Sequence, residues 1–595
     1  MRNQARLREL RDGVCYLTLD TPNSSVNVLN DALARWLHEE IDAAEAAGAR
    51  VIVLESGKPG SFLNGVGLML AGSVREPADA ARLTATARAA YERLEHSSLP
   101  TVAAIRGNCY GCGVELTLRC RYRVCADDFD THFYMTELSE YLFTPIFGAT
   151  HALPRLIGLE PATRFLIWGE RWSAQQAERE GLVDTCFDVA DFAARVHEFA
   201  LSVADRRRER APRATAAAPS VETVAELRER IAQLPAMYRE VYATTFDLME
   251  RAACAGIRAP EAEQLAAGNS SMKAESRAAR QFFFIRRLAH EVSQRGFDAA
   301  EAWQAEFDGS VAAQWLKSEL EARQPSGLEW VGRRNASGAG RVRALRFVGY
   351  ADTPRSDARE NTVWIRDRVL GRAPELTGTP LVYAPFRAEG VIEIACRPEH
   401  IASARAICGC LTRARFATVV STPVARLAID ELIRAFCRPL IEHALGRGSK
   451  SDAAKTLHEL GFLRFPGDWL SGVEKPALAA LLAPERAAGA DPDLLALLPR
   501  QNCSGGRADL ELRDALLLSL LSFAISSLDE RSLAHPSLVD LLAREVIGFP
   551  LGHCSLCRYM TVDRVKSLLP RDRRGLAPEL GNVIDFVEQG RDFYL

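Results

Sequence analysis

The sequence has no large excess of charge, no long apolar run and no start typical of a secretion signal. Net charge is −3 over 595 residues, so nothing in the composition favours nucleic acid or an anionic membrane as a partner. The opening MRNQARLREL is charged and is not followed by a signal-peptide apolar core. The longest apolar run, residues 515–528, contains serines and is too short to cross a bilayer. We expect a buried helix there.

Cysteine and the common hydrolase motifs offer little evidence of a metal or a nucleophile. The 14 cysteines are scattered along the chain without a secretion signal, which predicts a reduced, cytoplasmic protein. Cys554 and Cys557 form one CxxC, and Cys109 and Cys112 form another in a different predicted domain. Buried thiols are therefore favoured over a metal, and no metal is expected. Neither HExxH nor GxSxG occurs, so zinc-protease and α/β-hydrolase functions have no support.

The first fifth of the chain alternates strand and helix signals. Strand composition marks residues 13–21, 49–56 and 99–107. Residues 30–48 have helical spacing, with an asparagine cap at the start and a glycine after the end. Strands separated by helices predict an α/β domain.

Later segments suggest further domains. Residues 187–324 are almost entirely helical in pattern, and QPSGLEWVGRRNASGAGR after them is the best linker candidate. A short strand-rich section follows, then helices to the end. The predicted domains are a core at 1–190, a helical extension with connecting helices at 191–324, a linker at 325–340, a truncated Rossmann-like segment at 341–422 and helical domains at 423–595.

Two short segments carry most of the functional signal. GSFLNGVGL follows the strand at 49–56, and in IRGNCYGCGVELTLRC a glycine turn leads from a strand into a helix. Backbone N–H groups at such a turn can stabilise a developing negative charge, assisted by the helix dipole. Glu115 lies in the first turn of that helix, and Glu137 and Glu140 follow in YMTELSEYLF. Two carboxyl groups flanking one reacting centre can act as base and acid if their pKa values differ.

Residues 8–184 resemble the crotonase (enoyl-CoA hydratase/isomerase) superfamily. The resemblance lies in TPNSSVNVLNDAL, GSFLNGVGL, GCGVE and FGATHALPRLIGLEPATRFLIWGERWSAQQAEREGLVD. It implies a ββα spiral fold, with an oxyanion hole formed by the backbone N–H groups of Val66 and Cys112. It also implies Glu115 as one catalytic acid and Glu137 as the second, with Glu140 as the rival. Gly67 departs from the family, since an aspartate is common at this place, and Cys112 replaces a glycine.

The activity implied by this resemblance is hydration, dehydration or isomerisation of an acyl thioester through an enolate. Coenzyme A or an acyl-carrier protein would carry the substrate, and no cofactor bound for chemistry is expected. Two alternatives remain: another crotonase outcome, such as decarboxylation, C–C cleavage or thioester hydrolysis in a biosynthetic pathway, or a non-catalytic scaffold. Homo-oligomers and a complex with a partner enzyme are both open.

The second half resembles the 3-hydroxyacyl-CoA dehydrogenase part of the multifunctional fatty-acid oxidation α-subunit. The resemblance rests on KAESRAARQFFFIRRLAHEV, DELIRAFCRPLIEHAL and EVIGFPLGHCSLCRYM. A dinucleotide site needs GxGxxG between a strand and a helix, and Arg343 occupies the place of the third glycine. Aligned on Pro385, the family's catalytic histidine becomes Leu381 and its asparagine becomes Ala384, while Glu393 is expected to be structural. A degenerate module without NAD chemistry is therefore predicted.

Overall fold

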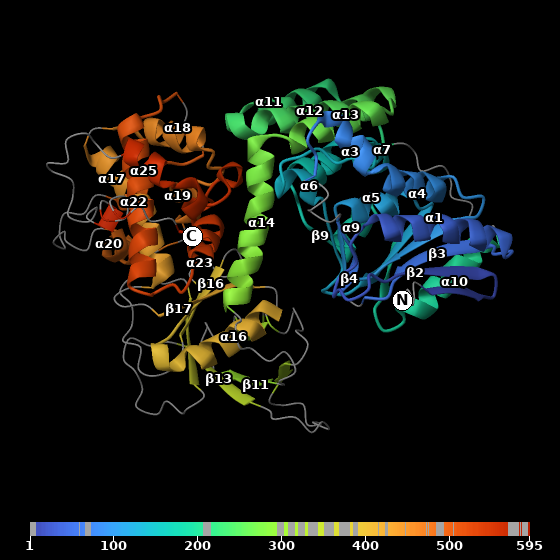
Figure 1. Cartoon of the computed structure of the whole chain (residues 1–595), viewed down its shortest axis with the longest axis horizontal. Coiled ribbons are helices and arrows are strands. Elements are labelled where there is room, and N and C mark those ends of the chain that lie inside the picture. Colours follow the sequence, from blue (N-terminus) through green and yellow to red (C-terminus); the bar gives the residue numbers. More distant parts are fainter. Residues whose placement is uncertain are drawn as a thin grey trace. The chain divides into compact units, whose positions relative to one another are not determined.

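The computed structural model divides the chain into two compact units, Met1–Arg280 and Gln281–Leu595 (Figure 1). The first described segments are 7–58, 60–65, 73–205 and 216–293. The remaining described residues are 303–307, 314, 316–318, 320, 328–330, 343–349, 362–367, 381–384, 391–413, 416–422, 427–446, 448–471, 473, 475–482, 493–501, 503, 505–568, 582–583, 585, 589 and 593–594.

A six-stranded sheet forms the base of the first unit. Its strand order is β1-β2-β3-β5-β7-β10, and every pairing is parallel except that of β1 with β2. The central strands are buried apolar runs, as expected for a parallel sheet covered on both faces. The predicted strands at 13–21, 49–56 and 99–107 are confirmed. The bounds are β1 Leu7–Arg11, β2 Val14–Leu19, β3 Val51–Ser56, β5 Thr101–Ile105, β7 Tyr122–Asp127 and β10 Thr185–Asp188.

Helices cover this sheet in the way that their apolar spacing predicts. In α1 (Asp31–Ala46), the cap residue Asn30 accepts a hydrogen bond from the Leu33 N–H at 2.9 Å, which confirms the predicted start. Helix α10 (Phe192–Ala204) packs its buried face on β2, β3, β5 and β7 (Figure 1). These contacts make the sheet a rigid base for the loops that leave a second, smaller sheet.

The second sheet has four strands in the order β4-β6-β8-β9. Strands β4 (Ser61–Asn64), β6 (Asn108–Tyr110) and β8 (His132–Tyr134) are parallel, and β9 (Trp172–Ser173) runs antiparallel to β8. Helix α5 (Cys112–Arg119) follows β6, and α6 (Thr136–Ser139) follows β8. The carboxyl ends of parallel strands share one edge, so the segments after β4, β6 and β8 emerge together.

More helices complete the first unit. Among them, α13 packs against α3 and α12, and α12 packs against α7. At the α13–α3 contact, a β-carbon on Gly268 would lie 2.1 Å from the Pro77 carbonyl oxygen, so only glycine allows this approach. The bounds are α3 Pro77–Leu83, α4 Ala85–Glu95, α7 Ala149–Ile157, α8 Leu159–Ala162, a π-helical turn Thr163–Ile167, α9 Ala174–Arg179, α11 Val221–Ala232, α12 Ala236–Ala255 and α13 Pro260–Ser271. Helix α14 (Ala274–Ser293) begins in the first unit and ends in the second, because the division falls after Arg280.

The second unit combines a mixed sheet with many helices. The described strands form the order β12-β11-β13-β14-β15-β16-β17, antiparallel only between β15 and β16. Two of them, β11 (Trp303–Phe307) and β12 (Leu328–Trp330), lie in segments expected to be helical extension and linker. Segments this short show no clear periodicity, so pairing decides their conformation: β11 pairs with β13 (Arg343–Gly349), and β12 pairs with β11. The other strands are β14 Thr362–Asp367, β15 Leu381–Ala384, β16 Val391–Ala395 and β17 Ala417–Ser421.

The helices of the second unit surround a large apolar cluster. The run at 515–528 lies inside α22 (Leu510–Asp529), most of whose leucines are buried, as predicted. In the part of the chain that the structure describes, none of the helices is both long and apolar enough to traverse a bilayer. The other bounds are 3-10 turns Pro398–His400 and Leu551–His553, α16 Ile401–Arg413, α17 Ala428–Leu445, α18 Lys450–Leu460, α19 Pro466–Trp469, α20 Lys475–Leu482, α21 Leu494–Leu497, α23 Pro536–Ile547, α24 Leu556–Tyr559 and α25 Val562–Leu568.

Glu393 caps a helix in this second unit. It is fully buried on β16, and its carboxylate accepts hydrogen bonds from the Ala428 N–H at 2.8 Å and the Ile429 N–H at 2.9 Å. Those amides begin α17, where backbone N–H groups have no partner within the helix. Leu381, on the neighbouring strand β15, is also buried and offers no proton acceptor.

Candidate active site

A sharp turn at Gly111 sets the direction of α5. Gly111 has φ +53° and ψ −120°, a conformation that side chains disfavour, and its N–H donates to the Tyr134 carbonyl at 2.8 Å. Helix α5 begins at the next residue, so the N–H of Cys112 is not used within the helix. The Tyr91 hydroxyl donates to the Cys112 carbonyl at 2.8 Å and holds this first residue in place.

A second turn, at Gly65, leaves the sheet beside the Gly111 turn. Strands β4 and β6 pair in parallel with Asn64 opposite Tyr110, and the Gly65 N–H donates to the Tyr110 carbonyl at 3.0 Å. Gly65 has φ +75°, which favours glycine. The predicted hole donor Val66 and its neighbour Gly67 lie outside the described residues. The segment that leads to Val66 therefore starts next to the N-terminus of α5.

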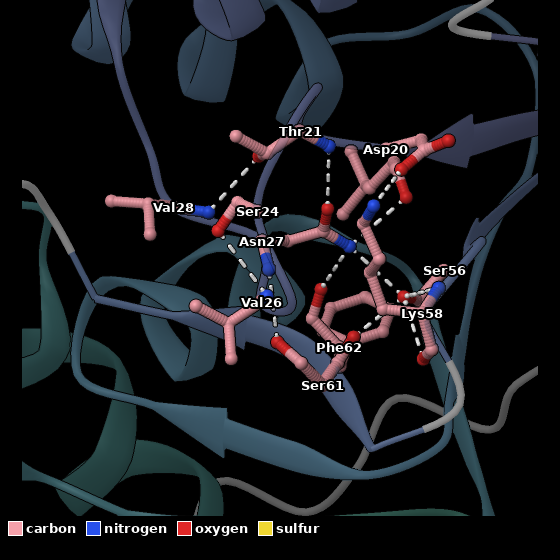
Figure 2. A network of polar contacts seen from close by, with 11 residues as sticks. Asp20, Thr21, Ser24, Val26, Asn27, Val28, Ser56, Lys58, Ser61 and Phe62 are labelled. Atoms are coloured by element: carbon pink, nitrogen blue, oxygen red, sulfur yellow. Dashed lines mark hydrogen bonds and ion pairs between the residues drawn. The ribbon is translucent and has the colours of Figure 1, made fainter. Parts of the chain in front are cut away.

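Asn27 ties the loop before α1 to β4, as Figure 2 shows. Its side-chain amide nitrogen donates to the carbonyls of Leu19 and Phe62 at 2.9 and 3.1 Å, and its oxygen accepts from the Thr21 N–H at 2.8 Å. Asn27 is fully buried, and its own carbonyl accepts from the Asn64 N–H at 2.8 Å. Nothing in the sequence distinguishes Asn27 from an exposed loop asparagine, because its burial depends on contacts with distant segments.

Glu115 is buried in the first turn of α5 with only half of its carboxyl group engaged. Its Oε1 accepts hydrogen bonds from the Phe147 N–H at 2.9 Å and the Ala149 N–H at 3.0 Å, at the start of α7. Its Oε2 has no hydrogen-bond partner among the described residues, although the side chain is 1% exposed. A buried polar atom without a partner is costly and points to a ligand or a reaction.

Glu137 lies at the N-terminus of α6, with its carboxyl group against the Gly111 turn. A β-carbon on residue 111 would lie 2.4 Å from Glu137 Oε1, so glycine is the residue that leaves room for this acid. Like Glu115, it is buried and its Oε2 has no partner among the described residues. The adjacent strands β6 and β8 are thus each followed by a short helix that carries one of the two acids, Glu115 on α5 and Glu137 on α6.

Glu140 is engaged differently from Glu137. Its Oε1 accepts a hydrogen bond from the Tyr134 hydroxyl at 2.9 Å, and the side chain is partly exposed. Burial raises the pKa of Tyr134, with the nearby charge of Glu140 as the next cause. Of the two predicted second acids, Glu137 is therefore the one placed beside Gly111 and Glu115.

Burial raises the pKa values of both buried acids. Desolvation raises the pKa of Glu115 to about 7, opposed by the hydrogen bonds from Ala149 and Phe147. Desolvation and then the charge of Glu115 raise the pKa of Glu137 to about 8. Because the two groups interact, their titrations are coupled. This is the environment that general acid–base chemistry requires.

Sequence reasoning missed a third buried acid, Glu263 on α13. Its Oε1 accepts from the Gly148 N–H at 2.9 Å, between the two amides that bind Glu115. The side chain is 3% exposed, and desolvation followed by the charge of Glu115 raises its pKa to about 8. No motif marks Glu263, since a glutamate in the first turn of a helix is ordinary.

The N-terminal unit can now be compared with known families. The family described as Enoyl-CoA hydratase/isomerase matches residues 9–259. Residues 9–259 are a crotonase domain. This confirms the predicted family for the N-terminal part, and the match extends well beyond the predicted core end at residue 190. The crotonase domain contains all the acids described above except Glu263, which follows it by four residues.

Curated relatives match part of the chain. The fatty acid oxidation complex subunit alpha of Aliivibrio fischeri is 33% identical over 197 residues, covering 33% of this chain and 28% of that protein. The corresponding subunit of Idiomarina loihiensis is 34% identical over 183 residues, covering 30% and 26%. The match thus spans about a quarter of the length of these relatives. A Bacillus halodurans enoyl-CoA hydratase structure covers 46% of this chain and 98% of its own, at 20% identity and TM-score 0.35.

Proposed function

We propose that the crotonase domain hydrates 2-enoyl thioesters, dehydrates 3-hydroxyacyl thioesters or isomerises enoyl thioesters carried by coenzyme A or an acyl-carrier protein. One observation carries the proposal: Glu115 and Glu137 are buried, have raised pKa values and each retain an unpartnered Oε2, next to the free N-terminus of α5. An enolate reaction needs this combination of two acids and a backbone oxyanion site.

In the proposed mechanism the thioester oxygen accepts hydrogen bonds from the N–H groups of Cys112 and Val66. Glu115, whose charged form is favoured by two backbone N–H hydrogen bonds, is ionised and takes a proton from water while the water oxygen bonds to the β-carbon. Negative charge moves to the thioester oxygen, where the two N–H groups and the α5 dipole stabilise it. Glu137, protonated, then delivers its proton to the α-carbon, and the reverse sequence dehydrates the product.

The same oxyanion site can support other outcomes, because fold does not determine reaction. The test is product analysis by mass spectrometry after incubation with a panel of 2-enoyl, 3-hydroxyacyl and malonyl-type CoA thioesters. Addition or loss of water, or a moved double bond, supports the proposal. Decarboxylation, chain cleavage or free acid assigns a different crotonase chemistry, and the absence of any turnover across CoA and carrier-protein thioesters supports a scaffold.

The dehydrogenase-like second half is proposed to lack NAD chemistry. Leu381, aligned with the catalytic histidine, is a buried hydrocarbon, and the retained Glu393 is occupied in capping α17. Calorimetry with NADH tests this: no heat of binding is expected at millimolar cofactor. Tight binding, or NAD reduction coupled to 3-hydroxyacyl-CoA oxidation, would overturn it.

A further inference from the structure

Glu115 and Glu263 share one turn of backbone. The three consecutive N–H groups of residues 147–149 donate to them alternately: Phe147 and Ala149 to Glu115 Oε1, and Gly148 to Glu263 Oε1 at 2.9 Å. The two acids come from different helices, α5 and α13, so the turn joins them without direct pairing. Any displacement of Glu263 would therefore also displace the backbone amides that orient Glu115.

Glu263 also has access to water that does not pass through the Glu115–Glu137 site. It lines a partly open pocket with Tyr91, Arg119, Phe147 and His151, and neither Glu115 nor Glu137 is part of that lining. We call this the back pocket. Its volume is about 30 Å³, which is enough for a water molecule, because one water needs about 10–15 Å³. A proton on Glu263 can thus equilibrate with bulk solvent while substrate occupies the other side of the turn.

Arginine side chains line the back pocket, and two of them form ion pairs with Glu95. Arg119 pairs with Glu95 and donates to the Phe147 carbonyl, and Arg258 also approaches Glu95. Burial and the charges of Arg155, Arg258 and Arg119 lower the pKa of His151 to about 4, so it is neutral at pH 7. Further charged groups on the elements around Glu263 include Arg88 and Glu92 of α4, Glu261 of α13, and Asp79 of α3, which pairs with Arg82. On α12, Asp247 and Glu250 pair with Arg228 and Glu240 pairs with Lys273, and the same helix carries Arg239 and Arg251.

Two buried carboxyl groups that interact cannot both ionise without a large cost. Glu115 Oε1 accepts two backbone N–H hydrogen bonds, whereas Glu263 Oε1 accepts one, and backbone donors stabilise the charged form of a carboxyl group. The favoured arrangement near neutral pH therefore has the proton on Glu263 and the charge on Glu115. That arrangement keeps Glu115 in the form needed to take a proton from water.

We propose that Glu263 is a positioning residue for Glu115: it anchors the other side of their shared turn and stays protonated so that Glu115 can ionise, with the back pocket connecting it to bulk water. The inference rests on the proposed role of Glu115 as a base. Its effect passes through the turn and through charge, and Glu263 itself does not touch the substrate.

The first test separates shape from charge in the full-length protein. Glu263→Gln keeps an oxygen that can accept from Gly148, so we expect kcat near pH 7 to change less than about 3-fold, while any step in the pH profile near pH 8 that belongs to Glu263 disappears. Glu263→Ala leaves the Gly148 N–H without its acceptor, so kcat should fall on the order of 10-fold or more with KM little changed. If both variants keep the wild-type kcat and pH profile, the proposal is wrong.

The second test reads the protons directly and needs no substrate. Infrared difference spectra recorded from pH 5 to pH 10 should contain a buried carboxylic-acid band that Glu263→Gln removes. Glu115→Gln should move the loss of that band to lower pH, because no neighbouring charge opposes ionisation of Glu263. Glu92→Gln, an exposed position on the same pocket, should change neither. An unmoved band in Glu115→Gln overturns the proposal, whereas a normal titration in a protein inactive on thioesters overturns only the proposed function.

Discussion

The Glu137 carboxyl group lies against the α-carbon of Gly111, so a β-carbon at position 111 would come within 2.4 Å of Glu137 Oε1. This contact joins the two parts of the proposed chemistry, because Gly111 also sets the start of α5 and hence the N–H of Cys112. One residue therefore controls both the acid and the oxyanion site.

Gly111→Ala should disable the site and destabilise the unit. The added methyl displaces Glu137, and the backbone conformation with φ +53° becomes strained, costing about 1–3 kcal/mol in the free energy of unfolding. Activity should fall on the order of 100-fold because the acid moves. Gly48→Ala is the matched control: Gly48 has φ +75° but nothing within 4 Å of its added β-carbon. Comparable losses of activity in both variants would show that Gly111 acts through strain alone.

Asn27→Ala should loosen the attachment of the loop before α1 to strand β4. The change leaves the Thr21 N–H and the carbonyls of Leu19 and Phe62 without a buried partner, costing about 2–3 kcal/mol in the free energy of unfolding. Activity should fall as well, because Asn27 fixes β4 just before Gly65. Asn30→Ala removes only the cap of α1 and should cost about 1 kcal/mol, with activity retained. Urea unfolding and initial rates are measured for both variants. Equal losses of stability and activity in Asn27→Ala and Asn30→Ala would contradict the role of Asn27 in fixing β4.

The raised pKa values make stability depend on pH with a definite sign. Glu115 and Glu137 have pKa values of about 7 and about 8 in the folded chain against a reference of 4.5. Between pH 4.5 and about 8 the folded state binds more protons than the unfolded state, so the free energy of unfolding falls as pH rises. Glu137→Gln should flatten this fall and be more stable than wild type at pH 9 by at least about 1 kcal/mol. An unchanged slope in urea titrations at several pH values would contradict the assignment.

Glu393→Ala should weaken the second unit and spare the chemistry of the first. Two amides at the start of α17 lose their acceptor, which should cost about 2–3 kcal/mol. Glu393→Gln keeps one acceptor and should cost less. Thioester turnover should match wild type in both variants. A lost activity without a change in unfolding would instead indicate a chemical role for Glu393.

Local patterns predicted the elements that bury regular stripes, such as α1, the central strands of the first sheet and α22. They also located Glu115, because a glycine turn between a strand and a helix is a local feature. They could not choose between Glu137 and Glu140, since the two lie one helical turn apart and differ in tertiary surroundings: Glu137 is buried against Gly111, and Glu140 is partly exposed and bonded to Tyr134. The roles of Glu263 and Asn27 depend on contacts distant along the chain. Strand β11 depends on pairing with β13, and β12 on pairing with β11, and no short stretch of sequence contains either pair.

The most direct test of the account is the rate of hydration of a short trans-2-enoyl-CoA or the matching carrier-protein thioester, compared between the wild type, Glu115→Gln and Glu140→Gln. Removal of the base predicts a loss of kcat of about 100-fold or more in Glu115→Gln, with little change in KM and an unaltered fold. Glu140→Gln, which changes the partner of Tyr134 and leaves Glu115 and Glu137 in place, should keep most of the activity. Full hydratase and isomerase activity in Glu115→Gln would contradict the central claim.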